Sequence, residues 1–532
     1  MSKMMVSGAK ESLAPRGEEA LVLNDFSLPL LLGAFGACWL LFLAWCALTP
    51  PIDNIEQLVW ISSLEWGYFK HPPLPTWILA AASMVLPQGP ALTFTLGAVF
   101  VLGAHAIFWV WLREVHGPRT ATILLLASLC ITFYNQRVHY YNHNVVMMPP
   151  IAVCILMIWR LTQRAGWSAW IAIGVAMGLG MLVKYQMALI GIAIGLWWLR
   201  MRWWRDPINR WGLLLATGIA SAIFLPHLIW LIHHDWAPLR YAETSSLGMS
   251  LSMSARMSDS TSWTTDWLFN RQMPAWMVMG AALGWAAWRT KKSRQAALEG
   301  QARIVHAPVT PTSPGATPPA FWREFSLLWG VFPLLFMLSL GLGLGVEMQN
   351  HWGTAFGLWM LPAALALAPS SLKYLNTRSA VRAAWVAFAL IQGLIVLQFW
   401  ATSPQGIDRL KTQHWQHFPS QAMAESLAPQ ARQALGGPID IIAGRSAIAG
   451  SLALHLPEHP KVLINGDLAT SPWVSAEELR TARVVEVFPA RELPEGAQWF
   501  SGGWAWRVGV SPLARLQGKD LPAQPQPQPP SK

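Results

Sequence analysis

The chain has 532 residues, of which 53% are hydrophobic and 12% are charged, whereas soluble domains contain roughly 25% charged residues. This composition excludes a soluble globular enzyme, a disordered chain and a disulfide scaffold, and it leaves a multi-span membrane protein. The net charge of +11 does not indicate a nucleic-acid partner, because the basic residues cluster in short connections between apolar runs, as topology signals do.

About eleven apolar segments are candidate membrane-spanning helices, since a span needs roughly 20 mostly apolar residues. In chain order they lie near residues 28–49, 91–112, 120–134, 145–161, 167–183, 186–199, 210–232, 274–288, 325–345, 354–369 and 381–401. Prolines 73, 75 and 87 bracket a further apolar segment, which predicts an interfacial or re-entrant helix over 74–87. The sequence thus predicts a polytopic α-helical membrane domain over 28–402.

The charges predict the orientation of these spans. If residues 1–27 form a cytoplasmic segment, alternate connections carry most of the arginines and lysines, as the positive-inside rule requires. Most of the acidic residues then fall on the opposite, outer side, among them Asp53, Glu56 and Asp266. We therefore expect a bacterial inner-membrane protein whose chemistry lies on the periplasmic side.

Three polar blocks interrupt the membrane domain: an outer loop over 49–73, a second outer loop over 233–273 and an inner linker loop over 289–324. Residues 403–521 form a separate region with short apolar runs at 439–442, 461–464 and 484–488 and a helical pattern over 446–456. These runs predict a small α/β domain on the periplasmic side. The Pro- and Gln-rich tail over 522–532 is typical of disorder.

The first outer loop contains the largest group of candidate functional residues. Asp53 and Glu56 follow the first span at a spacing of three, which places them on one face of a helix. A short basic and proline element with Lys70 and His71 then leads into the interfacial helix. Lys184 interrupts an apolar region between two spans, and an ionisable residue there is a functional candidate by default.

This loop resembles that of bacterial polytopic glycosyltransferases of family 39, which have the GT-C fold and are related to protein O-mannosyltransferases and the lipid A aminoarabinose transferase. The family has an acid pair after the first span and a "WGY…HPPL…W" stretch. Here these read Asp53-Asn54, Trp66-Gly67-Tyr68, His71-Pro72-Pro73-Leu74 and Trp77. Weaker matches are the Lys184-Tyr185 pair and Asn350-His351-Trp352.

The resemblance implies transfer of a hexose or pentose from a polyprenyl-phosphate donor to an envelope acceptor at the outer face. It assigns to Asp53, with Glu56 beside it, the activation of the acceptor nucleophile, a role that carboxylates perform chemically. The phosphate of the donor, which is the leaving group, needs nearby cations to stabilise its negative charge. The candidates for binding the donor phosphate or substrate are Lys184, Tyr185, Lys70, His71, Arg240, Asn142, Asn144 and His351.

Two departures from the family pattern weaken the expectation of a metal. Asn54 stands where many members have a second acid, and Asn142 and Asn144 lie in a stretch where many have an aspartate. We therefore assign no metal ligand and no cofactor, and the sequence leaves metal dependence open. The sequence leaves open the sugar, the acceptor (glycolipid, polysaccharide or protein) and the stereochemistry. Two other functions also remain open: a transporter or flippase for lipid-linked sugars, and a non-catalytic assembly protein.

Overall fold

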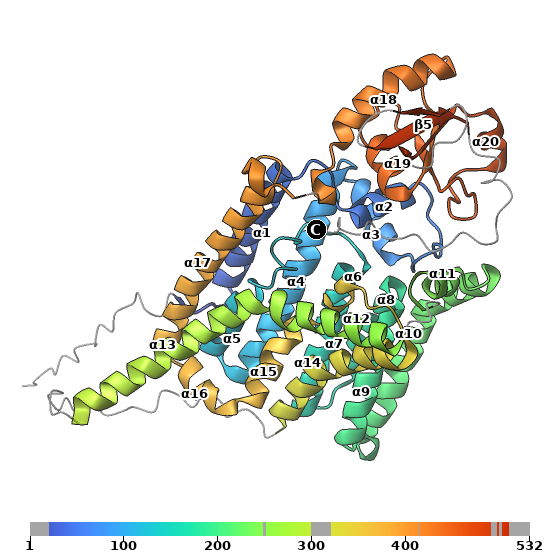
Figure 1. The fold of residues 1–532 in the computed structure, drawn as a ribbon. Coiled ribbons are helices and arrows are strands. Elements are labelled where there is room, and N and C mark those ends of the chain that lie inside the picture. The colour runs from blue at the N-terminus through green and yellow to red at the C-terminus, as the bar shows by residue number, and fades with distance from the viewer. Residues whose placement is uncertain are drawn as a thin grey trace, which may run out of the picture.

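The computed structural model describes residues 21–247, 252–298, 321–412, 414–490, 497–499 and 503–509. Most of the predicted N-terminal segment, much of the linker loop 289–324 and the whole tail 522–532 lie outside these residues. The described chain forms a helical bundle with a small mixed sheet at one end (Figure 1).

Each of the eleven apolar segments falls on helical structure. The helices of the bundle are α1 (Ser27–Cys46), α4 (Pro90–His116), α5 (Pro118–Ser128), α6 (His143–Val146), α7 (Met148–Gln163), α8 (Trp167–Val183), α9 (Ala188–Arg200), α10 (Pro207–His233), α13 (Met273–Leu298), α14 (Trp322–Ser339), α15 (Met360–Leu367) and α17 (Arg378–Thr402). Within the described ranges, six helical segments are long and apolar enough to cross a membrane: Ser27–Cys46, Pro90–His116, His143–Gln163, Pro207–His233, Trp322–Leu344 and Arg378–Thr402. The polytopic helical architecture is confirmed, and the number of spans stays a prediction.

Helices α1 and α17, which are far apart in the chain, lie side by side in the bundle (Figure 1). Their contact is aromatic, with the rings of Phe35 and Phe388 6.3 Å apart and those of Phe42 and Phe399 5.8 Å apart. This pairing brings the end of α17, and the chain that follows it, next to the start of the first outer loop.

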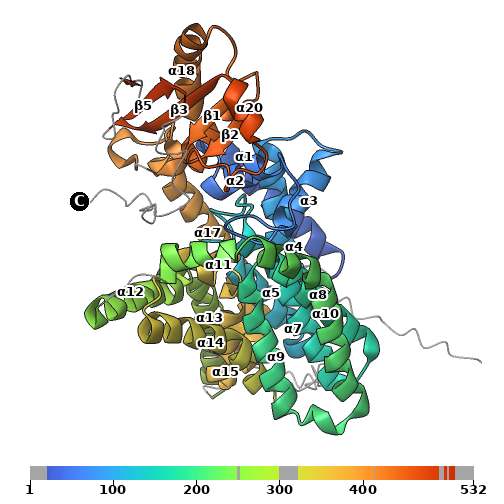
Figure 2. The same ribbon diagram turned by 90° about the vertical axis from the view of Figure 1, so that its right-hand side faces the viewer.

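The first outer loop forms α2 (Ile52–Trp60) and leads into α3 (Leu74–Ser83), so the helix predicted within 74–87 is present. Pro75 lies in the first turn of α3, where the missing amide proton costs no helical hydrogen bond. The second outer loop contains α11 (Ala237–Ala242) and α12 (Met253–Thr265). The sheet domain stands over the end of the bundle that carries α2 and α3 (Figure 2).

The C-terminal region contains a five-stranded sheet in the order β2-β1-β3-β5-β4. Its strands are β1 (Ile441–Gly444), β2 (Lys461–Ile464), β3 (Val484–Pro489), β4 (Gln498–Trp499) and β5 (Trp504–Val508), and its helices are α18 (Ser420–Leu435), α19 (Ser446–Ala453) and α20 (Ala476–Thr481). Strand β1 pairs in parallel with β2 and β3, whereas β5 is antiparallel to β3 and β4. The three strands and the helix expected from the sequence are confirmed.

The sheet domain rests on the first outer loop through α19 and α2. A Cβ atom on Gly450 of α19 would lie 2.5 Å from Cγ2 of Ile55 and 3.1 Å from Cγ2 of Val59. The two helices can approach this closely only because residue 450 has no side chain. A further tie is the indole of Trp415, which donates to the carbonyl of Pro50 at 2.8 Å.

We expect Gly450→Leu to destabilise the contact between α19 and α2 by about 1–3 kcal/mol, as overpacking does in other cores. The same substitution at Gly103 in α4, whose Cβ would meet no atom within 4 Å, provides the matched control. Thermal unfolding of both variants in detergent measures the difference. Equal melting temperatures for the two variants would contradict the close contact.

Candidate active site

Asp53 lies in the first turn of α2, where the helix dipole favours a carboxylate. Burial opposes its ionisation, but Lys70, His351 and the hydrogen bond from Asn142 together hold the pKa of Asp53 below its ordinary value. Asp53 is therefore charged at neutral pH although it is partly buried.

The orientation of Asp53 is set by Asn142. The Asn142 side-chain oxygen accepts from the amide of Val145 at 3.0 Å and caps α6. Its nitrogen must then face the opposite direction, where it donates to Oδ2 of Asp53 at 2.7 Å. Oδ1 of Asp53 has no hydrogen-bond partner among the described residues, so this oxygen is available to an incoming group.

The Asn54 side chain bonds to other parts of the chain rather than to Asp53 and holds the loop in place. Its side-chain nitrogen donates to Oγ1 of Thr93 and to the carbonyl of His139, both at 2.9 Å. Its oxygen accepts from the amide of Tyr141 at 2.9 Å. Because this completely buried amide both donates and accepts, a carboxylate could not replace it. The departure from the family acid pair thus has a structural reason.

A cavity of about 70 Å³, here called the Asp53 cavity, opens beside the carboxylate. It is lined by Asp53, Phe133, Arg137, Tyr140, Asn142, Val145, His351 and Thr354. His351 comes from the segment before α15, so three distant parts of the chain meet here. Burial and then Lys184 lower the pKa of His351 to about 4, which leaves its ring neutral at physiological pH.

Lys184 is the cation best placed to receive an anion. It ends α8, and its ammonium donates to Oδ1 of Asn144 at 2.7 Å and lies 5.8 Å from the ring centre of Trp352. It forms no ion pair with a carboxylate in the described ranges. Burial lowers the pKa of Lys184 to about 7, against the opposing effect of Asp53. An anion bound beside Lys184 would relieve this penalty and restore the ammonium charge.

Lys70 and Glu56 form an ion pair with a nitrogen–oxygen distance of 3.0 Å. Oε1 of Glu56 also accepts from the hydroxyl of Ser446 in the sheet domain at 3.1 Å. Burial disfavours the ammonium ion, but Glu56, Tyr241 and Asp53 hold the pKa of Lys70 above its ordinary value. Glu56, predicted to be catalytic beside Asp53, thus connects Lys70 with the sheet domain.

The His71 ring lies against that of His143 at a tilt of 35°, with 4.0 Å between the ring centres. Burial and the neighbouring His143, Lys70 and Lys184 lower the pKa of His71 well below its ordinary value. A neutral imidazole here offers a hydrogen bond to a substrate rather than a charge.

The structure does not bring every predicted residue to this site. Tyr185 shares a 2.8 Å hydrogen bond with His227, whose other nitrogen contacts the carbonyl of Trp66. This chain of contacts ties the turn after α8 to α10 and to the first loop. Arg240 lies on α11 with a side chain 60% exposed, 3.9 Å from Asp235, and it lines neither side of the Asp53 cavity.

Arg137, from the loop that precedes α6, also lines the Asp53 cavity. Its guanidinium carbon lies 4.7 Å from the ring centre of Phe133 and 5.4 Å from that of Tyr140. Arg271 also lies 4.7 Å from the Phe133 ring and pairs with Asp266 at 2.8 Å. Arg137 makes no such pair with a described carboxylate. Only the tertiary fold reveals this difference.

Among the residues that the structure describes, no group of three His, Cys, Asp or Glu side chains could hold a metal ion. The polar groups around Asp53 are instead amides, neutral imidazoles and cations. Their chemistry suits a phosphate and a hydroxyl-bearing substrate.

Known proteins that this chain resembles are glycosyltransferases. Residues 70–230 match the family described as dolichyl-phosphate-mannose-protein mannosyltransferase. A lipid A galacturonosyltransferase of Rhizobium johnstonii is 24% identical over 38% of this chain and 43% of its own length. A lipopolysaccharide core galacturonosyltransferase of the same organism is 23% identical over 34% of this chain and 36% of its own. The chain thus spans less than half the length of these curated relatives.

The fold is also found among solved structures. ArnT from Cupriavidus metallidurans bound to undecaprenyl phosphate superposes with a TM-score of 0.55 at 14% identity, covering 94% of this chain and all of that one. Its apo state gives a TM-score of 0.51 at the same identity and covers 94% of this chain and 99% of that one. The resemblance to family 39 and the GT-C fold are confirmed.

We expect Asn54→Asp to destabilise the protein by about 1–3 kcal/mol or more, because a buried carboxylate leaves the Thr93 hydroxyl and His139 carbonyl without their donor. Asn24→Asp is the matched control, since the exposed side chain of Asn24 only accepts hydrogen bonds, from the backbone amides of Phe26 and Ser27. Thermal unfolding in detergent compares them. If Asn54→Asp is as stable as Asn24→Asp, the anchoring role of Asn54 is wrong.

Proposed function

We propose that the protein transfers a sugar from a polyprenyl-phosphate donor to a hydroxyl or amine of an envelope glycolipid. The observation that carries this proposal is the charged Asp53 carboxylate, oriented by Asn142 and with one free oxygen at a cavity. The named relatives act on lipid A and on the lipopolysaccharide core, and a protein of the same fold is bound to undecaprenyl phosphate. The charge layout of the sequence favours the periplasmic face of the inner membrane for this reaction.

The acceptor binds so that its hydroxyl or amine donates to Oδ1 of Asp53. As the acceptor atom forms a bond to the anomeric carbon, its proton passes to Asp53. The bond between the anomeric carbon and the phosphate oxygen breaks, and its electron pair leaves with the polyprenyl phosphate. Because the carboxylate is ionised throughout the physiological pH range, it accepts the proton without a prior activation step.

Lys184 neutralises the phosphate that carries this negative charge away. Its ammonium is held toward the site by Asn144, and it is not already occupied by a described carboxylate. Lys70, which is paired with Glu56 and lies near Asp53, adds positive charge, and His71 offers a hydrogen bond. Both lysines are partly buried, and preorganised cations act more strongly in such surroundings than in bulk water.

We expect Asp53→Asn to lower sugar transfer by about 100-fold or more, the usual scale for loss of a general base. Asparagine can still accept from Asn142, so protein levels should stay normal. Asp235→Asn, which changes an outer-side carboxylate that is 82% exposed, should retain activity. The measurement is transfer from radiolabelled polyprenyl-phosphate sugars in membranes supplied with envelope extract.

Equal transfer by Asp53→Asn and the native protein would exclude the role of Asp53. Absence of transfer by the native protein with every donor tried would instead favour a transporter or flippase, or a non-catalytic assembly protein. The labelled product identifies the acceptor.

We expect the donor KM to be constant below about pH 7 and to rise by up to tenfold per pH unit above it. The reason is that Lys184 has a pKa of about 7 and binds the phosphodiester only when protonated. Lys184→Arg, whose guanidinium stays protonated, should remove the rise. Initial rates at saturating acceptor between pH 6 and 9 test this, and a pH-independent donor KM in the native protein would contradict it.

A further inference from the structure

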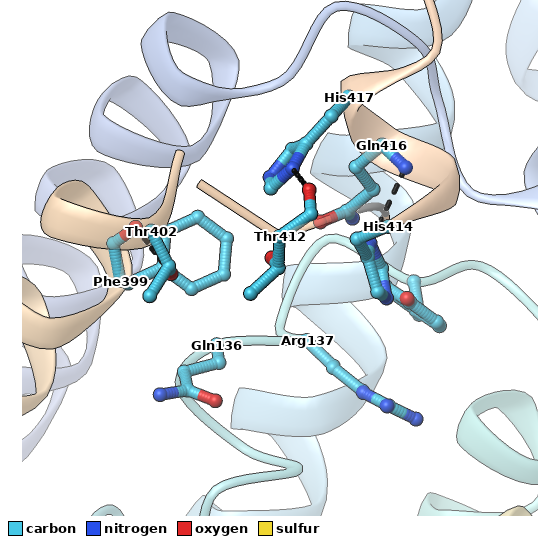
Figure 3. A pocket seen from close by; sticks show the side chains of 9 residues that line it. Gln136, Arg137, Phe399, Thr402, Thr412, His414, Gln416 and His417 are labelled. Carbon is cyan, nitrogen blue, oxygen red and sulfur yellow. Dashed lines mark hydrogen bonds between the residues drawn. The ribbon is translucent and has the colours of Figure 1, made fainter. Parts of the chain in front are cut away.

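A second cavity, of about 190 Å³, lies between the bundle and the chain that leads into the sheet domain. We call it the junction cavity. One wall is the loop with Gln136 and Arg137, and the opposite wall is the segment with Thr412, His414, Gln416 and His417 (Figure 3). Arg137 and Tyr140 line both this cavity and the Asp53 cavity, so the two are neighbours with a shared wall.

The walls of the junction cavity carry donors and no carboxylate. Arg137, which pairs with no described carboxylate, is the cation. Nδ1 of His414 accepts from the amide of Gln416 at 3.3 Å (Figure 3), so in its neutral form the hydrogen of His414 is on Nε2 and is free to be donated. Gln136 adds a side-chain amide for which no described partner is found.

The size of the cavity restricts what can enter. Pockets for drug-sized ligands are about 300–1,000 Å³, so about 190 Å³ suits a phosphate or carboxylate group with some water. Thr412 and His414 are exposed at its edge, which makes the cavity accessible from the end of the bundle. Lys184 lines neither cavity and belongs to a separate anion position.

We propose that the junction cavity binds an anionic group, a phosphate or carboxylate, of the acceptor glycolipid through Arg137 and His414. This inference rests on the proposed function. The donor phosphate, which is attached to its lipid chain, binds at Lys184 within the bundle. When the anionic group of the acceptor is bound in the junction cavity, a neighbouring hydroxyl of the same acceptor extends past Arg137 and Tyr140 toward Asp53. The two anions are thus bound on different sides of the carboxylate.

The test uses paired charge changes at Gln136, which lines the junction cavity but not the Asp53 cavity. Gln136→Glu should weaken binding of phosphorylated lipid A to the full chain in detergent by at least about tenfold, and Gln136→Lys should strengthen it. Neither variant should change the binding of lipid A whose phosphates have been removed. Gln430→Glu, on exposed α18, carries the same charge change outside the cavity and serves as the control.

Steady-state kinetics show which substrate the Gln136 variants affect. With phosphorylated acceptor, Gln136→Glu should raise the acceptor KM and leave the donor KM unchanged. A change in donor KM alone would overturn the assignment to the acceptor, and unchanged binding of both forms of lipid A by both Gln136 variants would overturn the anion site. If the native protein transfers no sugar but still binds phosphorylated lipid A in a charge-dependent way, the proposed function fails while the anion site stands.

Discussion

The candidate active site depends on one buried amide, that of Asn54. Its hydrogen bonds to Thr93, to the carbonyl of His139 and from the amide of Tyr141 join the first loop to α4 and to the loop that ends in Asn142. Asp53 and Asn142 are adjacent in the chain to these anchored groups, so their 2.7 Å contact follows from the anchor. Gly97 allows the same approach, because a Cβ there would lie 2.6 Å from the carbonyl oxygen of Tyr140. The position of the Asp53 carboxylate thus depends on a neighbouring amide whose hydrogen bonds are all made within the protein.

The sheet domain is part of this arrangement. Glu56 accepts from Lys70 on one side and from Ser446 on the other, and α19 packs directly on α2. The chain before α18 also contributes a wall of the junction cavity. In the proposed mechanism the donor is bound by the bundle, whereas the acceptor meets groups from both regions. A division of binding between two parts of the chain allows acceptor recognition to vary while the donor site is kept.

The sequence predicts those features that are local. The polytopic helical class, the helix after the first loop and the strands of the C-terminal region follow from apolar runs and their breaks. The motif that makes Asp53 a candidate lies within one short loop. The anchoring role of Asn54 and the link between Glu56 and Ser446 depend on partners tens to hundreds of residues away, which no local pattern encodes. Arg137 differs from Arg271 in forming no ion pair with a described carboxylate, whereas Tyr185 contacts His227 and Arg240 lies near Asp235.

The hydrogen bond between Ser446 and Glu56 joins residues 390 positions apart. At a synthesis rate of about 5–20 residues per second, the first loop emerges tens of seconds before its partner in the sheet domain exists. During that interval the surface of α2 that α19 later covers is exposed, and Glu56 lacks its hydrogen bond from Ser446. The order of biosynthesis therefore makes completion of the site one of the last events in the maturation of the protein. A ribosome that stops early leaves a chain whose first loop lacks its contacts with Ser446 and α19.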